Sequence, residues 1–143
     1  MKANELRIGN LITFKGKVRI VDGVSLCGSH LMPRVPLVNL HYMYQEKELL
    51  NINKLEPIPL TEEWLLKLRS RESLPVNYKN IYIMLDRFLL TYQASYGFWY
   101  VYDFSGEEML YITKVEFVHE WQNVYFALNG EELTLTEHPT PAS

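Results

Sequence analysis

Residues 78–113 read YKNIYIMLDRFLLTYQASYGFWYVYDFSGEEMLYIT, and they contain the main sheet expected for this protein. Apolar side chains recur at every second position in four runs, a spacing that places them on one face of a β-strand. Turn-like segments separate the runs at Asp86-Arg87, at residues 94–97 and at residues 105–107. The stretch therefore predicts a four-stranded antiparallel meander.

Residues 114–128 follow with apolar side chains at helical spacing, and Thr113 and Glu116 match a capping box that starts a helix. Asn129-Gly130 supplies the stop, because glycine enters the left-handed cap conformation without penalty. We therefore predict an amphipathic helix from Lys114 to Leu128 that covers one face of the meander. Its apolar stripe is Phe117, Trp121, Val124 and Leu128.

A short helix is predicted directly after Pro57 and Pro59, which disfavour helical backbone up to Leu60. Thr61 is the expected N-cap, and two glutamates follow it where the helix dipole favours negative charge. The helix lasts about two turns, so it depends on tertiary packing for its stability. Its expected packing face is Trp64, Leu65 and Leu68.

The N-terminal part predicts a β-hairpin with strands at residues 11–14 and 18–21 and a tight turn at Lys15-Gly16-Lys17. Asp22-Gly23 offers a further turn, and residues 37–55 fit either a helix or a strand. The opening of the chain resembles that of SH3-like barrels, some of which bind nucleic acid. That likeness concerns the fold alone.

These elements predict an α+β protein in three parts. We expect residues 1–56 to form an N-terminal β-rich, SH3-like subdomain, residues 57–136 to hold the short helix, the sheet and the C-terminal helix, and residues 137–143 to form a flexible tail. These parts are expected to make one compact unit. The chain has 143 residues, 48% of them hydrophobic and 22% charged. This composition excludes a disordered chain, and the length is sufficient for a core without disulfides or metal.

The chain contains one cysteine, and the segment that follows Met1 lacks the apolar run of a signal peptide. The longest stretch without a charged residue, 88–102, is too short to cross a bilayer. We therefore expect a soluble, cytoplasmic protein.

Three stretches together carry a family resemblance: ELRIGNL at residues 5–11, PIPLTEEWL at 57–65 and VHEWQNVYFALNGEEL at 118–133. The chain resembles a family of small uncharacterised proteins encoded by Bacteroides-type bacteria, often in prophages and other mobile elements. The resemblance implies no activity, cofactor or catalytic residue.

The sequence contains only partial matches to the residue spacings of catalytic and metal sites. Cys27 precedes His30 by three positions, a pairing that could make a nucleophile or half of a metal site. His119-Glu120 matches part of a zinc-protease helix, but Asn123 stands where the second histidine is needed. We expect a non-enzymatic protein with no cofactor and no metal.

The aromatic residues are unusually dense between residues 92 and 111. Strand alternation sends Trp99 to one face and Phe98, Tyr100 and Tyr102 to the other. A core built from both faces, a protein-contact or self-association surface, and base stacking all account for this density. The candidate protein-contact residues are Trp99, Tyr96 and Phe126.

Charge is uneven along the chain. Residues 1–72 hold 11 Lys and Arg against 8 Asp and Glu (+3), and residues 73–143 hold 3 against 9 (−6). The candidate nucleic-acid contacts are Lys15, Lys17 and Arg19 in the N-terminal hairpin, where lysines are also typical of a solvated strand edge. The leading hypothesis is an accessory protein that acts through an unidentified protein partner or self-association. The alternative is nucleic-acid binding by the hairpin.

Overall fold

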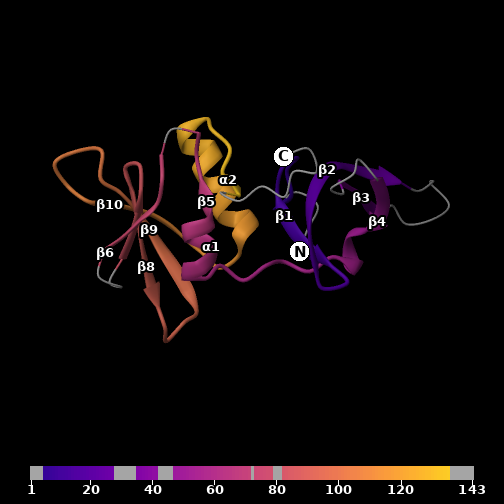
Figure 1. Ribbon diagram of the computed structural model, residues 1–143, viewed down its shortest axis with the longest axis horizontal. Helices are drawn as coiled ribbons and strands as arrows, with labels where there is room; N and C mark the ends of the chain where they lie inside the picture. Colours follow the sequence, from indigo (N-terminus) through magenta and orange to yellow (C-terminus); the bar gives the residue numbers. More distant parts are fainter. Residues whose placement is uncertain (1–4, 28–34, 42–46, 72, 79–81, 136–143) are drawn as a thin grey trace, which may run out of the picture. The chain divides into compact units, whose positions relative to one another are not determined.

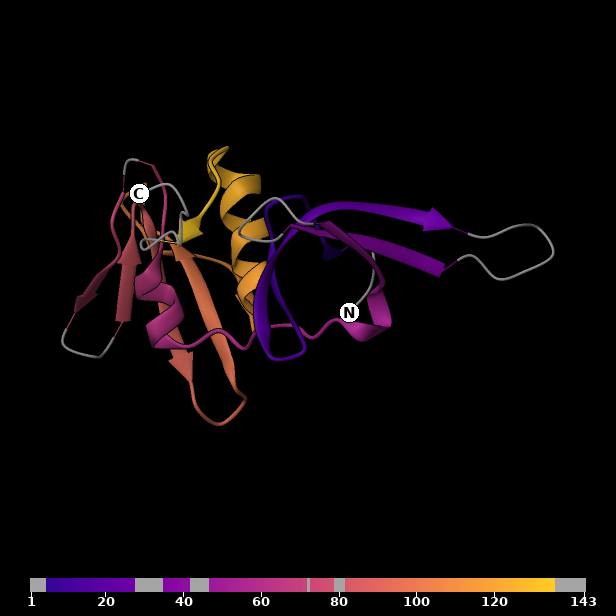
Figure 2. The same ribbon diagram turned by 45° about the vertical axis from the view of Figure 1, so that its right-hand side comes forward.

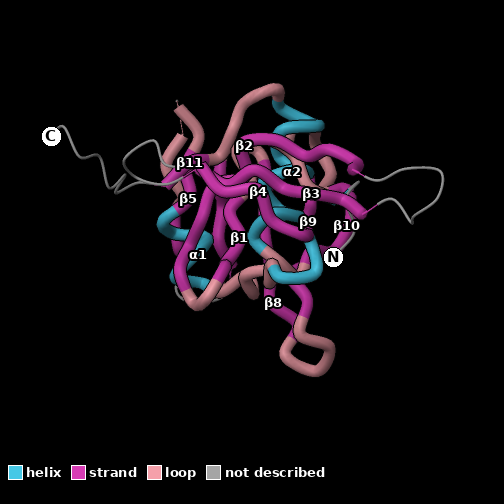
Figure 3. Tube along the Cα trace, turned by 90° about the vertical axis from the view of Figure 1, so that its right-hand side faces the viewer, coloured by secondary structure: helices cyan, strands magenta, loops and turns pink. Residues whose placement is uncertain are grey.

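The described residues form two compact units, one ending at Ile58 and the other starting at Pro59. Antiparallel strands dominate both, and α-helices occur in the second (Figures 1 and 3), so the α+β class is confirmed. Within these residues, every helix is too short or too polar to span a membrane. The structure, a computed structural model, describes residues 5–27, 35–41, 47–71, 73–78 and 82–135.

A four-stranded antiparallel sheet in the order β1-β2-β3-β4 makes up most of the first unit. The predicted hairpin is confirmed: Phe14 pairs with Lys17, and Lys15 and Gly16 between them have φ of +52° and +75°. Two successive left-handed residues are typical of a tight hairpin turn. The strands are β1 (Leu11–Phe14), β2 (Lys17–Cys27), β3 (Val35–His41) and β4 (Lys47–Asn51).

Two details of this unit differ from the sequence-based expectation. Asp22-Gly23 is not a turn but lies inside β2, where the pairing with β3 shifts register between Val21 and Gly23. A bulge of this kind bends a strand without reversing it, so β2 and β3 continue side by side (Figure 2). The ambiguous segment after residue 37 contains strands and then a 3-10 turn, η2 (Ile52–Lys54), rather than an α-helix.

Segments that flank the sheet complete the core of the first unit. Thr13 of β1 and Glu56 exchange two backbone hydrogen bonds of 2.9 Å, so the chain after η2 runs beside β1. The SH3-like character of this unit stays a prediction. The buried core cluster is Leu6, Ile12, Phe14, Val21, Ile52 and Leu55.

The second unit contains a five-stranded antiparallel sheet in the order β10-β9-β8-β7-β6. It confirms the predicted four-stranded meander and adds β6, a three-residue edge strand that follows Pro75 and is too short to show a period. The strands are β6 (Val76–Tyr78), β7 (Tyr82–Leu85), β8 (Phe88–Gln93), β9 (Phe98–Asp103) and β10 (Leu110–Val115).

The short helix α1 (Glu62–Lys67) begins as predicted, because the Trp64 backbone N–H donates to the Thr61 hydroxyl at 3.3 Å. After α1 the chain forms β5 (Leu68–Arg69), which pairs with β11 (Thr134–Leu135) from the end of the described chain. This small ribbon ties α1 to the segment that follows the second helix.

The C-terminal helix α2 (Val118–Asn129) begins four residues later than expected, so the predicted capping box at residues 113–116 is wrong. Residues 113–115 instead belong to strand β10 and are paired with β9. The cap comes instead from Glu120, whose Oε1 accepts the backbone N–H groups of Phe117 (2.9 Å) and Glu116 (3.0 Å).

The buried stripe of α2 also differs from the predicted one. Leu128, expected to be buried, is 41% exposed. Trp121 meets the Phe88 ring edge-on at 6.0 Å, which seats α2 on the sheet (Figure 1). Gln122 tolerates burial because its Nε2 donates to the Leu133 carbonyl at 3.1 Å. The buried side chains of α2 are Val118, His119, Trp121, Gln122 and Tyr125.

Candidate functional site

The sheet face of the second unit that lies opposite α2 is aromatic. Trp99 and Val101 of β9 are buried on the helix side, so Phe98, Tyr100 and Tyr102 point to the other side, as strand alternation predicts. Cross-strand partners share a face, and the pairing extends this surface over all five strands. We call it the aromatic face; it consists of Val76, Tyr78, Tyr82, Met84, Leu89, Thr91, Gln93, Phe98, Tyr100, Tyr102, Tyr111 and Lys114.

One row of the aromatic face crosses the whole sheet. Directly paired residues link strand to strand in the order Val76, Met84, Leu89, Tyr102 and Tyr111. The two ends of the row, Val76 and Tyr111, are 47% and 55% exposed, whereas Leu89 in the middle is 6% exposed. Apolar side chains therefore follow one another from one edge strand to the other, and the exposed part of the row lies at its two ends.

Neighbouring side chains hold the rings of this face. The Tyr111 ring lies edge-on to Tyr100 and Tyr102, with centroids 5.9 and 5.7 Å apart. The Nζ of Lys114 lies 4.5 Å from the Phe98 ring centroid, within cation–π range. Rings held by their neighbours lose less conformational entropy when a partner binds.

The aromatic face belongs to an acidic unit. Residues 59–138 contain 6 Lys and Arg against 12 Asp and Glu, a net charge of −6. Residues 1–58 contain 8 against 5, a net charge of +3. Among the residues of the aromatic face, Lys114 is the charged one. A polyanion is therefore repelled by the second unit as a whole.

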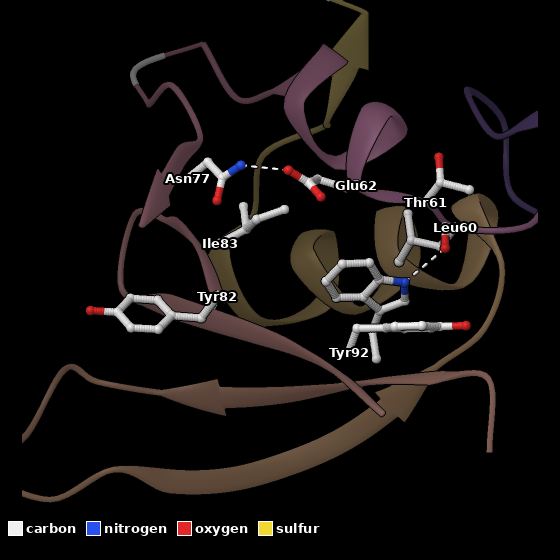
Figure 4. A pocket seen from close by; sticks show the side chains of 8 residues that line it. Leu60, Thr61, Glu62, Asn77, Tyr82, Ile83 and Tyr92 are labelled. Carbon is white, nitrogen blue, oxygen red and sulfur yellow. Dashed lines mark hydrogen bonds between the residues drawn. The ribbon is translucent and has the colours of Figure 1, made fainter. Parts of the chain in front are cut away.

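A pocket of about 470 Å³ opens on the helix side of the same unit, where the start of α1 meets strands β6 to β9 (Figure 4). Its volume lies within the range of small-ligand sites, about 300–1,000 Å³. Aromatic, apolar and polar side chains mix in its wall. The lining residues are Leu60, Thr61, Glu62, Asn77, Tyr82, Ile83, Tyr92 and Trp99.

Two contacts shape the pocket. The Trp99 indole N–H donates to the Leu60 carbonyl at 2.7 Å, and the Tyr92 ring lies 5.0 Å from the indole. On another wall, Asn77 and Glu62 point toward each other, and the Asn77 amide donates to the Glu62 carboxylate at 2.5 Å (Figure 4). An aromatic wall and an oriented carboxylate therefore face the same space.

A second hollow, of about 590 Å³, lies beside β5 and β11. Arginine and glutamate side chains share its lining, so their charges oppose each other and favour no one kind of ligand. The lining residues are Arg69, Ser70, Arg71, Glu131, Glu132 and Thr134.

The three candidate protein-contact residues do not share a surface. Trp99 is buried on the helix side of the sheet, with 7% of its surface exposed. Tyr96 is 67% exposed in the turn between β8 and β9, and Phe126 is 39% exposed near the end of α2. The contacts themselves stay a prediction. Sequence reasoning placed Tyr100 and Tyr102 on the opposite face but did not select them as contact residues.

The candidate nucleic-acid residues lie together at the hairpin of the first unit. Lys15 is in the turn, with its Nζ 5.1 Å from the Phe14 ring centroid, and Lys17 begins β2. Both lysines are exposed, and Arg19 on β2 is half-buried. Lys17 and Arg19 are two residues apart on one strand, so they share a face. Binding by these residues stays a prediction.

Among the described residues, the cysteine and histidine candidates are not brought together in a metal site. Cys27 is the last residue of β2, and His30 lies outside the described residues. His119 is buried, and its ring stacks against that of Phe117 with centroids 6.0 Å apart. In the part of the chain that is described, no three His, Cys, Asp or Glu side chains gather as a metal site would require.

Sequence reasoning missed the pocket, because Glu62 and Asn77 belong to segments that only the tertiary fold brings together. It also did not predict that the aromatic face includes residues of β6 and β7. In comparisons with known proteins, no family model, no curated protein and no solved structure matches the chain.

Proposed function

We propose that this protein is a non-enzymatic accessory protein that acts through protein–protein contacts made by the aromatic face. The observation that carries the proposal is the unbroken apolar row from Val76 to Tyr111 across five strands. A sheet with one face packed on helices usually presents polar side chains on the other. Aromatic residues are instead enriched where proteins meet.

The charge of the second unit selects the kind of partner. Two copies would bring net charges of −6 and −6 together, and like charges oppose association. The favoured partner is a different protein whose contact surface is apolar at its centre and basic at its rim. Tyrosine rings already held by their neighbours provide the amphipathic contacts that such interfaces use.

The test compares capture by wild type and by a variant of the aromatic face. Tyr111→Lys places a charge on edge strand β10, a position where lysine is tolerated in folded proteins. Leu66→Lys is the matched control, because Leu66 is 37% exposed on α1, away from this face. Both variants and wild type are immobilised and exposed to a lysate of Bacteroides-type bacteria, the group to which the family resemblance points.

A protein captured by wild type and by Leu66→Lys, but at least tenfold less by Tyr111→Lys, supports the proposal. Equal capture by all three proteins contradicts it. Light scattering on the purified protein provides a second measurement. If the wild type is a dimer and Tyr111→Lys is a monomer, the partner of the aromatic face is a second copy of the chain rather than a different protein.

A second candidate function is nucleic-acid binding by the first unit. It is supported by the net charge of +3 over residues 1–58 and by the exposed Lys15 and Lys17 at the hairpin. The proposed SH3-like character of this unit is compatible with such a role as an analogy of fold.

A further inference from the structure

The pocket on the helix side of the second unit combines two features that recognise one chemical group. The first is an aromatic wall. Tyr92 and Trp99 line the pocket with ring centroids 5.0 Å apart, and the indole is fixed by its hydrogen bond to the Leu60 carbonyl. Tyr92 is 51% exposed, so part of its surface remains open to a ligand.

The second feature is a carboxylate. Glu62 lines the pocket, and the Asn77 amide holds one of its oxygens (Figure 4). The neighbouring Glu63 is engaged differently, since it pairs with Lys67 at 2.8 Å. Lys67, the last residue of α1, therefore pairs with Glu63, while Glu62 lines the pocket.

We propose that this pocket binds an organic ammonium group. Ring faces attract cations through the aromatic quadrupole, and a carboxylate adds direct charge attraction. An anion is repelled by Glu62, and a neutral apolar ligand leaves the carboxylate without a counter-charge. The pocket shares Tyr82 with the aromatic face, but Glu62, Tyr92 and Trp99 do not belong to that face, so the proposal does not depend on the function proposed above.

The test is a titration of the whole protein with choline, followed by NMR of the three tryptophan indole N–H signals. The Trp99 signal is expected to shift and saturate, with a dissociation constant on the order of 1–10 mM for so small a ligand. The uncharged isostere 3,3-dimethylbutan-1-ol is titrated in parallel. It is expected to bind at least tenfold more weakly, because it lacks the cation.

Two pairs of matched variants localise the effect. Glu62→Gln keeps an acceptor for Asn77 but removes the charge, and is expected to weaken choline binding about tenfold. Glu63→Gln is its control and is expected to leave binding unchanged. Tyr92→Ala is expected to weaken binding about threefold, whereas Tyr96→Ala, in the adjacent turn and outside the pocket lining, leaves it unchanged.

The ammonium group can come from a free amine or from a lysine side chain of a peptide. A short peptide that carries trimethyl-lysine is compared with the same peptide carrying norleucine. Tighter binding of the trimethyl-lysine peptide than of choline supports a peptide source, and the reverse supports a free amine. No saturable shift with either cation, equal binding of the neutral isostere, or unchanged binding by Glu62→Gln would overturn the proposal.

Discussion

The two sheets of this protein bury their apolar faces in different ways. In the first unit, chain segments before β1 and after β4 supply Leu6, Ile52 and Leu55 to the core. In the second unit, α1 and α2 cover one face, and the opposite face carries rings. The second unit leaves an aromatic surface that is explained if a partner covers it.

Charge separates the two units as well. The first has a net charge of +3 and places lysines at a hairpin, and the second has −6 and places tyrosines on a sheet. Opposite charges favour different partners, so the comparison predicts that nucleic acid and protein would bind to different units.

The largest expected effect is in the core under α2. Trp121 is fully buried and meets the Phe88 and Tyr125 rings edge-on, so Trp121→Ala is expected to lower the free energy of unfolding by about 3–5 kcal/mol. Denaturant unfolding measures this change. Trp64→Ala is the matched control, with an expected loss of about 1 kcal/mol because Trp64 is only half-buried on α1. Equal losses would show that α2 does not anchor the sheet.

Nucleic-acid affinity is the next effect in size. If Lys15, Lys17 and Arg19 contact three phosphates, affinity for DNA is expected to fall about 40-fold between about 50 and 200 mM salt. Fluorescence anisotropy with labelled single- and double-stranded DNA and RNA measures it. Charge reversal at all three residues is expected to abolish this binding, whereas Lys114→Glu on the acidic unit leaves it unchanged. Absent or salt-independent binding would remove the second candidate function.

Substitutions at two adjacent positions of β9 test how much each face of the sheet contributes to the free energy of unfolding. Val101 is fully buried on the helix side, and Val101→Ala is expected to lower the free energy of unfolding by about 2 kcal/mol. Tyr102→Thr, on the aromatic face and partly exposed, is expected to lower it by less than about 1 kcal/mol. Denaturant unfolding of both variants measures the difference. A larger loss at Tyr102 would mean that the aromatic face is already part of a folded core.

The smallest expected effect concerns Tyr125 on α2. Burial raises the pKa of its phenol above the ordinary value of 10, and its oxygen accepts a hydrogen bond from Asn129 at 2.9 Å. Tyr125→Phe is expected to lower the free energy of unfolding by about 1 kcal/mol at pH 7.

The pH dependence of the same pair provides a further check. Above about pH 10 the unfolded chain loses a phenol proton that the folded protein still holds, so the stability of wild type falls as the pH rises through the folded pKa. Tyr125→Phe lacks this contribution. The stability difference between the two proteins is therefore expected to shrink from pH 9 to pH 11, and a constant difference would contradict the raised pKa.

Local sequence patterns predicted several elements correctly because each depends on neighbouring residues. Gly16 allows the positive φ of the first hairpin, Thr61 caps α1 through its own hydroxyl, and Gly130 ends α2 with a φ of +74°. Strand alternation also placed Trp99 opposite its neighbours on β9. Each of these follows from backbone conformation or side-chain period alone.

The start of α2 could not be predicted in the same way. Residues 113–115 fit a helix start and a strand equally well, and pairing with β9 settled the choice in favour of the strand. The backbone hydrogen bonds of a sheet come from a distant segment, so a local capping signal loses to them.

By itself, the sequence determined the α+β class, the meander, the hairpin and the caps of α1 and of the α2 C-terminus, because these depend on residues a few positions apart. Only the tertiary structure decided which surface is aromatic across five strands, and which carboxylate faces the Tyr92 and Trp99 wall. Glu62 and Asn77 are 15 residues apart and meet because edge strand β6 pairs with β7 beside α1. The approach of α1 to β6 is a tertiary contact between two separate elements, and no local pattern in the sequence predicts it.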